Sequence, residues 1–250
     1  MFEGEEYMEK RSDEKYLGDV ISTDGKNFKN IKTRIAKGTG IVNKILTMLE
    51  GIPFGKQYFK VGTILRDSLL VSSMLFNSEA WYHLTNAELD LLETVDLSLL
   101  RQMLKAPKGT PKEMIYLELG LVPFRDLIRG RRLGFLHSIL HEDSKSLVNK
   151  FFQTQLKHRT KKDWVTTVLD DLDYLNIKEL DFQTIKNIKQ TEYMKIIKQK
   201  VREKSFEKLE NLKKSHRKVE DVNIAVLSCK NTCNQTQQKL LKMKHNLSLS

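Results

Sequence analysis

Between residues 28 and 49, hydrophobic side chains recur at the three- and four-residue spacing of one face of an α-helix. Most lysines of this stretch fall off that face, so the pattern predicts an amphipathic helix over roughly residues 26–50 with a basic solvent side. Gly38 and Gly40 weaken the prediction of one unbroken helix, because glycine is a poor helix former. The hydrophobic positions are Phe28, Ile31, Ile35, Val42, Ile45 and Leu49.

A short strand is predicted just before this helix. Residues 16–21 have the composition of a strand, and Asp24-Gly25 is a strong turn signal. No partner strand is expected after it, because the hydrophobic spacing then becomes helical. Residues 1–14 are acidic and show no pattern, which is typical of a loose terminus.

Two further helices follow from breaks and caps in the sequence. Glycine and proline interrupt residues 51–55, and the apolar stretch after them predicts a second helix over roughly residues 56–77, central to the core. Thr85 and Glu88 have the spacing of a capping box, in which each side chain satisfies a backbone N–H of the other residue. A third helix is therefore expected to begin there and to run through Leu104.

The middle of the chain predicts shorter helices. The segment Thr110-Pro111-Lys112-Glu113 fits a second capping box, with proline at the first helical position, where its missing N–H costs nothing. Gly120 ends that helix and Pro123 opens the next one. Two more helices are expected over about 147–156 and 164–172.

The C-terminal part has a different composition. No glycine follows Gly134 and no proline follows Pro123, which favours long helices joined by polar connections. From residue 184 to about 219, apolar positions thin out and lysines crowd in, predicting one or two basic helices that project from the body. Residues after Asp221 are rich in Gln, Asn and Lys and are typical of partly disordered chain.

These elements predict a mainly α-helical protein with three regions. Residues 1–25 form a tail and a short strand-turn entry, and residues 26–175 form a helical bundle. Residues 176–250 form a basic helical extension with a loose C-terminus. A chain of 250 residues is long enough to bury a substantial core.

The distribution of charge along the sequence indicates a candidate binding partner. The net charge is +11, and it is concentrated in two zones. Residues 26–60 carry 8 Lys and Arg against one acid, and residues 183–250 carry 16 against 6. Two basic zones of this kind indicate a nucleic-acid partner. The alternative is that they are ordinary solvated helix surfaces.

No catalytic constellation accompanies this charge. The sequence lacks the Phe/Tyr-x-Asp-Asp segment that places two metal-binding carboxylates in a polymerase, and it lacks a phosphate-binding glycine-rich loop. Asp170, Asp171 and Asp173 are close in sequence, but on a helix neighbouring side chains diverge by about 100°. We therefore expect no enzymatic activity from this chain alone, no catalytic residues and no cofactor.

A metal site is not expected either. The two cysteines, Cys229 and Cys233, are too few for a disulfide framework. With His245 and the distant His216 they could supply soft ligands, but the usual two-residue zinc-knuckle spacing is missing. No apolar run of 18 residues or more and no signal peptide are present. We expect a soluble intracellular protein, nuclear or cytoplasmic, without a membrane partner.

The nucleic-acid hypothesis selects particular residues. Basic side chains of the first and second helices could follow a phosphate backbone without reading sequence. Tyr16 could stack near a sugar, and Gly18 would let the backbone approach closely; alternatively, Tyr16 and Leu17 pack into the core and Gly18 serves a bulge. Four arginines of the helix after Pro123 are further candidates: Arg125, Arg129, Arg131 and Arg132. The candidate binding residues are Lys15, Tyr16, Leu17, Gly18, Lys26, Lys29, Lys32, Arg34, Lys37, Lys56, Lys60 and Arg66.

Several short segments occur in an order that is similar to one protein family. Tyr-Leu-Gly at 16–18, together with the segments below, resembles the region just after the polymerase palm in reverse transcriptases of non-LTR, LINE-like retrotransposons. The similarity covers roughly residues 15–175. The other segments are Gly-Ile-Val (40–42), Ile-Pro-Phe-Gly-Lys (52–56), Asn-Ser-Glu-Ala-Trp (77–81), Leu-Leu-Arg (99–101), Tyr-Leu-Glu-Leu-Gly (116–120), Arg-Arg-Leu (131–133) and Asp-Trp (163–164).

The resemblance implies that these residues bind nucleic acid and do not catalyse polymerisation. In such enzymes, residues 16–18 would correspond to the element that grips the primer end, and the rest to the thumb and connector that hold the RNA or DNA template–primer duplex. The catalytic palm, with its aspartates, is missing and could be supplied by another chain. Trp81 and Trp164 would then be core anchors, and Glu79 could pair with Arg101. The rival interpretations are a helical protein-interaction module and a non-functional relic of such an element.

Overall fold

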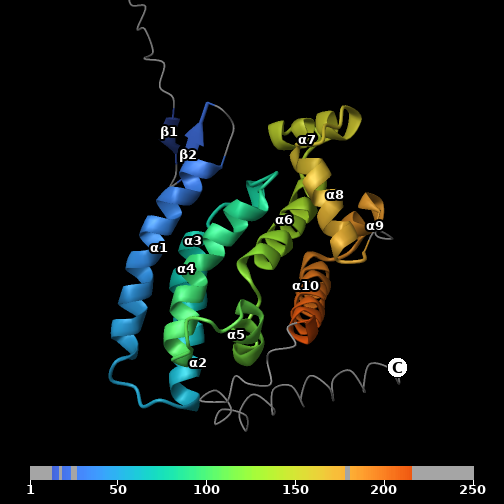
Figure 1. Ribbon diagram of the computed structural model, residues 1–250. Coiled ribbons are helices and arrows are strands. Elements are labelled where there is room, and N and C mark those ends of the chain that lie inside the picture. Colours follow the sequence, from blue (N-terminus) through green and yellow to red (C-terminus); the bar gives the residue numbers. More distant parts are fainter. Residues whose placement is uncertain (1–12, 17–18, 24–26, 178–180, 216–250) are drawn as a thin grey trace, which may run out of the picture.

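The computed structural model describes residues 13–16, 19–23, 27–177 and 181–215, and the fold is mainly helical with a short two-stranded sheet at its start (Figure 1). The predicted fold class is therefore confirmed. The helical segments are α1 (Phe28–Leu49), α2 (Lys56–Leu65), η1 (Arg66–Val71), α3 (Ser72–Met74), η2 (Ser78–Ala80), α4 (Asn86–Leu104), α5 (Lys112–Leu119), α6 (Phe124–His141), α7 (Leu147–Lys157), α8 (Trp164–Tyr174), α9 (Phe182–Asn187) and α10 (Gln190–Ser215).

The entry to the fold is a strand pair, which corrects the prediction of one strand over residues 16–21. Strands β1 (Asp13–Tyr16) and β2 (Asp19–Ser22) pair antiparallel, with Tyr16 opposite Asp19. The sequence of β1, Asp-Glu-Lys-Tyr, is mostly polar and gave no strand signal. Its pairing rests on backbone hydrogen bonds, which composition does not report. The predicted turn at Asp24-Gly25 lies outside the described residues.

Helix α1 is unbroken, and one of its two glycines explains how closely it packs. A Cβ atom on Gly38 would lie 2.4 Å from the Sδ of Met74 and 2.9 Å from a methyl of Val95. Glycine at this position therefore lets α1 approach α3 and α4. A Cβ on Gly40 would meet nothing within 4 Å, so packing gives no reason for glycine there.

The second predicted helix is confirmed, but it is not uniform. Its first ten residues form α2, the next six form the π-helical segment η1, and α3 ends the helix at Met74. A π-helical turn holds an extra residue relative to an α-helix. The π-helical segment begins at Arg66, whose side chain is almost completely buried. The helix ends before the predicted Asn77, which has a left-handed backbone conformation at φ 56°.

One predicted capping box is confirmed and the other is wrong. Thr85 accepts from the N–H of Glu88, whose carboxylate in turn accepts from the N–H of Thr85, so α4 begins as predicted. At α5, the residue just before the helix is Pro111, which makes no side-chain cap, and Thr110 lies outside the helix. Proline fixes an extended approach there, so threonine is one residue too early to cap.

The helix boundaries around α5 and α6 agree with the remaining predictions. Gly120 ends α5 in a left-handed conformation, with φ 63°, and Pro123 immediately precedes α6. Helices α7 and α8 occupy the predicted positions within two residues at each end. Asp163 caps α8 by accepting the N–H of Thr166 at 2.7 Å. Burial opposes ionisation of Asp163, but hydrogen bonds from Thr160 and Thr166 keep its pKa below the usual value.

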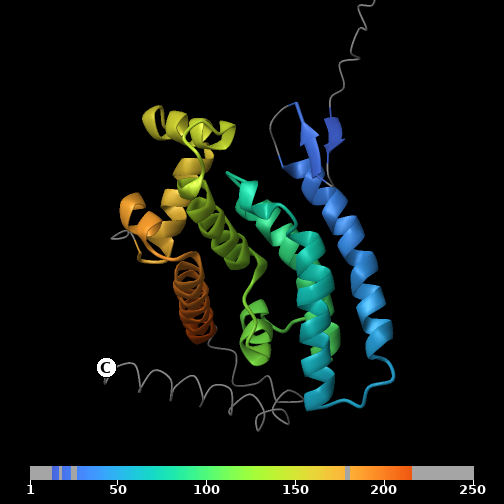
Figure 2. The ribbon, with the colours of Figure 1, turned by 180° about the vertical axis from the view of Figure 1, so that it is seen from behind.

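Two hydrophobic cores share helix α6. The first contains α1, η1, α3, α4, α5, the beginning of α6 and Leu209 near the end of α10, and the second contains the rest of α6 with α7, α8, α9 and the first part of α10. Ile128 belongs to the first core, whereas Leu133 and Leu136 belong to the second. Helix α6 therefore joins the two halves of the protein, as Figure 2 also shows.

Within the described residues 184–215, the chain does not project from the body, which corrects the prediction for this part of the basic extension. Helix α10 lies along α6, and its Tyr193, Ile197, Val201 and Leu209 are all buried (Figure 2). These residues form a single stripe at spacings of four and eight. One narrow apolar stripe is enough to attach a helix whose other faces are polar. Because lysines dominate the composition of this segment, the composition did not indicate that the helix packs against the protein.

Tyr193 leads to a first testable prediction. Its hydroxyl is buried and has no hydrogen-bond partner among the described residues, and burial raises its pKa. Tyr193→Phe should stabilise the fold by about 1 kcal/mol at neutral pH, because an unsatisfied hydroxyl no longer needs desolvation. A raised pKa costs nothing while both states keep the proton; above about pH 10 the unfolded tyrosine ionises first and stability falls.

Urea unfolding of both proteins at neutral pH and above about pH 10 measures this effect. The advantage of the phenylalanine variant should grow as the pH rises. An equal or smaller advantage at high pH would contradict the assigned burial of this hydroxyl.

Candidate nucleic-acid interface

The solvent side of α1 is a lysine face. Lys29, Lys32, Lys37 and Lys44 are all exposed on this helix, which contains no Asp or Glu. At 1.5 Å per residue, its 22 residues span roughly 33 Å. That length is close to one turn of a nucleic-acid duplex. We refer to these four side chains as the α1 lysine face.

Small side chains separate these lysines. Ala36, Thr39, Gly40 and Asn43 are exposed on the same side of the helix. Because none of them is bulky, the surface between the lysines is low, and a phosphate backbone can approach the helix there. The open space at Gly40 agrees with such an approach.

The first two lysines have partial partners inside the protein. The Nζ of Lys29 lies 2.8 Å from an oxygen of Asp13, in an exposed ion pair. The Nζ of Lys32 lies 4.4 Å from the centre of the Phe28 ring. Exposed pairs of this kind contribute little stability, so both ammonium groups can exchange them for a phosphate. Three more predicted lysines are exposed nearby in sequence, namely Lys15, Lys56 and Lys60.

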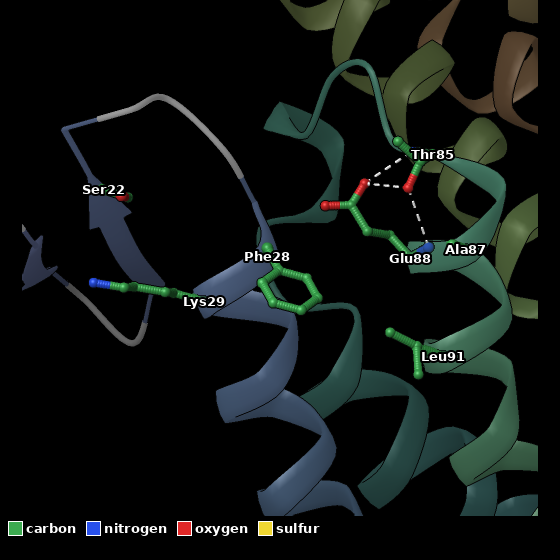
Figure 3. Close-up of a pocket in the computed structure, with 7 residues that line it drawn as sticks. All are labelled: Ser22, Phe28, Lys29, Thr85, Ala87, Glu88 and Leu91. Carbon is green, nitrogen blue, oxygen red and sulfur yellow. Dashed lines mark hydrogen bonds between the residues drawn. The ribbon is translucent and has the colours of Figure 1, made fainter.

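A hollow of about 440 Å³ lies at the start of α1 (Figure 3). Phe28 and Lys29 line it from α1, and Glu88 and Leu91 line it from α4. One carboxylate oxygen of Glu88 accepts from both the N–H and the hydroxyl of Thr85, each at 2.8 Å. That carboxylate therefore serves as a helix cap. No cluster of His, Cys, Asp and Glu suited to a metal ion occurs in the described part of the chain.

Arg34 is not part of this interface, which corrects one predicted site residue. Only 4% of its surface is exposed. Its guanidinium donates to the carbonyl of Ser73 at 2.9 Å and forms an ion pair with Asp19. Arg34 thus attaches the hairpin and α3 to α1. The sequence contained this signal, because position 34 falls in the buried stripe between Ile31 and Gly38.

Arg66 is corrected for the same reason. It is 2% exposed and binds Asp96 through two hydrogen bonds, both of 2.7 Å. The hydroxyl of Tyr116 donates to the same carboxylate at 3.0 Å, and Arg66 also donates to the carbonyl of Val122. Burial, and then the negative charge of Asp96, raise the pKa of Tyr116 well above its usual value. The pair joins η1, α4 and the connection between α5 and α6.

The four arginines of α6 all have partners within the protein. Arg125 binds Glu93 at 2.6 Å, and Arg129 binds Asp126 at 2.8 Å. Arg132 binds Asp171 at 2.7 Å, which gives a structural role to one member of the acidic cluster at residues 170–173. Arg131 donates to the carbonyl of Leu75. Arg132 is buried, so phosphate contact by this residue is excluded, whereas Arg125, Arg129 and Arg131 are half-buried and for them phosphate contact stays a prediction.

The two tryptophans are buried, as the resemblance implied. Trp81 is 4% exposed, and Trp164 donates from its ring to the carbonyl of Glu79 at 2.8 Å. The suggested pair of Glu79 with Arg101 is not among the ion pairs of the described residues, where the Nε of Arg101 is buried without a hydrogen-bond partner.

Several predicted site residues lie outside the described structure. The backbone of Tyr16 belongs to β1, but its side chain is not described. Leu17, Gly18 and Lys26 lie wholly outside, as do the possible zinc ligands His216, Cys229, Cys233 and His245. The primer-grip and zinc hypotheses therefore stay predictions.

Comparisons with known proteins leave the family open. No family model matches the sequence, and neither a curated protein nor a solved structure shows significant similarity to it. Across the described helices, none combines the length and the apolar character needed to cross a lipid bilayer.

Proposed function

We propose that this chain binds a nucleic-acid duplex through the α1 lysine face, by contacts to phosphates. The observation that carries the proposal is the difference in exposure between several arginines of the protein and the lysines of α1. The arginines at 34, 66 and 132 are buried against acids of the protein, whereas the lysines of α1 are exposed on a helix without a single acid. Lysine is a mobile point charge that suits phosphate contacts without sequence readout.

The order of short segments described above adds a more specific proposal. We infer that the chain corresponds to the thumb and connector of a LINE-like reverse transcriptase, and that its duplex is a template–primer of RNA and DNA. In this role these residues bind the duplex and carry out no chemistry, because the resemblance places the catalytic aspartates in the palm and not in the thumb or connector. Purified protein with Mg²⁺, deoxynucleotides and a primed template should extend no primer; extension would refute this assignment.

The binding proposal is tested by reversing charge on the face. Lys37→Glu together with Lys44→Glu should weaken binding to a labelled RNA–DNA hybrid by at least about tenfold, because two phosphate contacts become repulsive. Fluorescence anisotropy at low salt measures the change. Lys37 and Lys44 are exposed, so the fold should tolerate both substitutions.

A matched control distinguishes a specific effect of the α1 lysine face from an effect of net charge on binding. Lys195→Glu with Lys198→Glu changes the charge equally on the exposed side of α10. This variant should bind nearly as tightly as the wild type. Equal losses in the two variants would contradict a specific role for α1, and binding lost only in the α10 variant would move the interface to that helix.

A further inference from the structure

Helix α7 presents an unusually exposed apolar surface. Leu147 is 69% exposed, Phe151 is 61% exposed and Val148 is 45% exposed, and their spacing places the three on one side of the helix. The opposite side is buried, with Phe152 and Leu156 packed into the second core. The helix is thus anchored to the protein by one face and presents apolar side chains to solvent on the other. We refer to the three exposed residues as the α7 ridge.

Cations surround this ridge. From Ser144 to Lys162 the chain carries no acid, and its six basic side chains are all exposed. The nearest acids are Glu142 and Asp143 before this stretch and the helix-capping Asp163 after it. The basic side chains precede the helix, accompany its flank and follow its C-terminus; they are Lys145, Lys150, Lys157, Arg159, Lys161 and Lys162.

The shape of the surface favours a flat, deformable partner. The described hollow next to α7 is lined by polar side chains, among them Asn149, Gln153 and Lys186, so it offers no apolar groove for a peptide side chain. Helix α7 lies crosswise at one end of the molecule, beyond the ends of α6 and α8 (Figures 1 and 2). A planar surface can therefore reach the helix along its length.

We propose that α7 docks on an anionic lipid surface. The α7 ridge would enter the boundary between headgroups and acyl chains, and the surrounding lysines would lie among anionic headgroups. This arrangement needs no membrane-spanning segment, so it revises the expectation of no membrane partner, which rested on the lack of one. The proposal is independent of duplex binding, because it uses other residues on another helix.

Cosedimentation of the full chain with vesicles tests the proposal. One set contains phosphatidylcholine alone, and the other adds about one-quarter phosphatidylserine. The protein should sediment only with the second set. Leu147→Ser with Phe151→Ser should reduce binding about tenfold while leaving every charge in place. Lys150→Glu with Lys157→Glu should reduce it by a similar factor.

Controls decide what a loss of binding means. Ile64→Ser removes an apolar side chain that is 56% exposed on α2 and should leave vesicle binding unchanged. Helical circular dichroism should match the wild type in every variant. Unaltered vesicle binding by Leu147→Ser with Phe151→Ser would overturn the proposal, because charge alone would then explain it. Lack of binding to the anionic vesicles, or self-association abolished by the same substitutions, would also overturn it.

Discussion

Asp96→Asn is expected to destabilise the protein by about 3–5 kcal/mol, which is a large part of the stability of an ordinary domain. Asp96 is completely buried and is the bidentate partner of the buried Arg66. An asparagine has nearly the same shape but no charge, so the guanidinium would remain desolvated without a counter-ion. Urea unfolding of the variant and the wild type, followed by circular dichroism, measures the difference.

Asp67→Asn is the matched control for this substitution. Asp67 also contacts Arg66, at 2.9 Å, but its side chain is 62% exposed. Water screens that pair, so the change should stay within about 0.5 kcal/mol. Similar losses in the two variants would contradict the assignment of Asp96 as the partner that keeps Arg66 inside the core.

Arg132→Met should have the second largest effect, a loss of about 3 kcal/mol. Its guanidinium binds Asp171 at 2.7 and 3.1 Å and donates to the carbonyl of Trp81 at 3.2 Å. Without it, the buried Asp171 keeps Arg129, at 3.2 Å, as its one cationic partner among the described residues, and the carbonyl of Trp81 loses a donor. Arg132 connects α6 with α8 and with the segment after η2, so the loss should affect both cores.

Two further variants make this prediction specific. Arg159→Met removes an exposed arginine and should leave the urea midpoint nearly unchanged. Adding Asp171→Leu to Arg132→Met should recover part of the loss, because the unpaired buried charge is then removed as well. A double variant that is less stable than the sum of its single changes would contradict a pairing of these two side chains.

The helical frame was predictable because its signals are local. The capping box at Thr85 and Glu88, the glycine at 120 and the period of the hydrophobic positions in α1 each depend on a few neighbouring residues. The strand β1 was missed, because a polar segment pairs through its backbone. The docking of α10 was missed because a single buried stripe is diluted by lysines on its other faces.

The candidate interface was only partly predictable, for a related reason. In the sequence, a basic residue in a helix looks the same whether its side chain faces solvent or a buried carboxylate. For Arg34 the helical period would have decided the matter, since it shares a stripe with Ile31 and Gly38. For Arg66 and Arg132 the partners, Asp96 and Asp171, are 30 and 39 residues away. Such pairs are created only by the tertiary fold.

The salt dependence of duplex binding tests the role of the α1 lysine face most directly. Anisotropy of a labelled RNA–DNA hybrid, repeated across salt concentrations, gives the slope of log affinity against log salt. About four lysine–phosphate contacts predict a slope near −3.5, or roughly a hundredfold loss between about 50 and 200 mM salt. Lys37→Glu with Lys44→Glu should make the slope shallower by about two, whereas Lys195→Glu with Lys198→Glu should not. A wild-type slope near zero, or the same slope in all three proteins, would contradict duplex binding by this face.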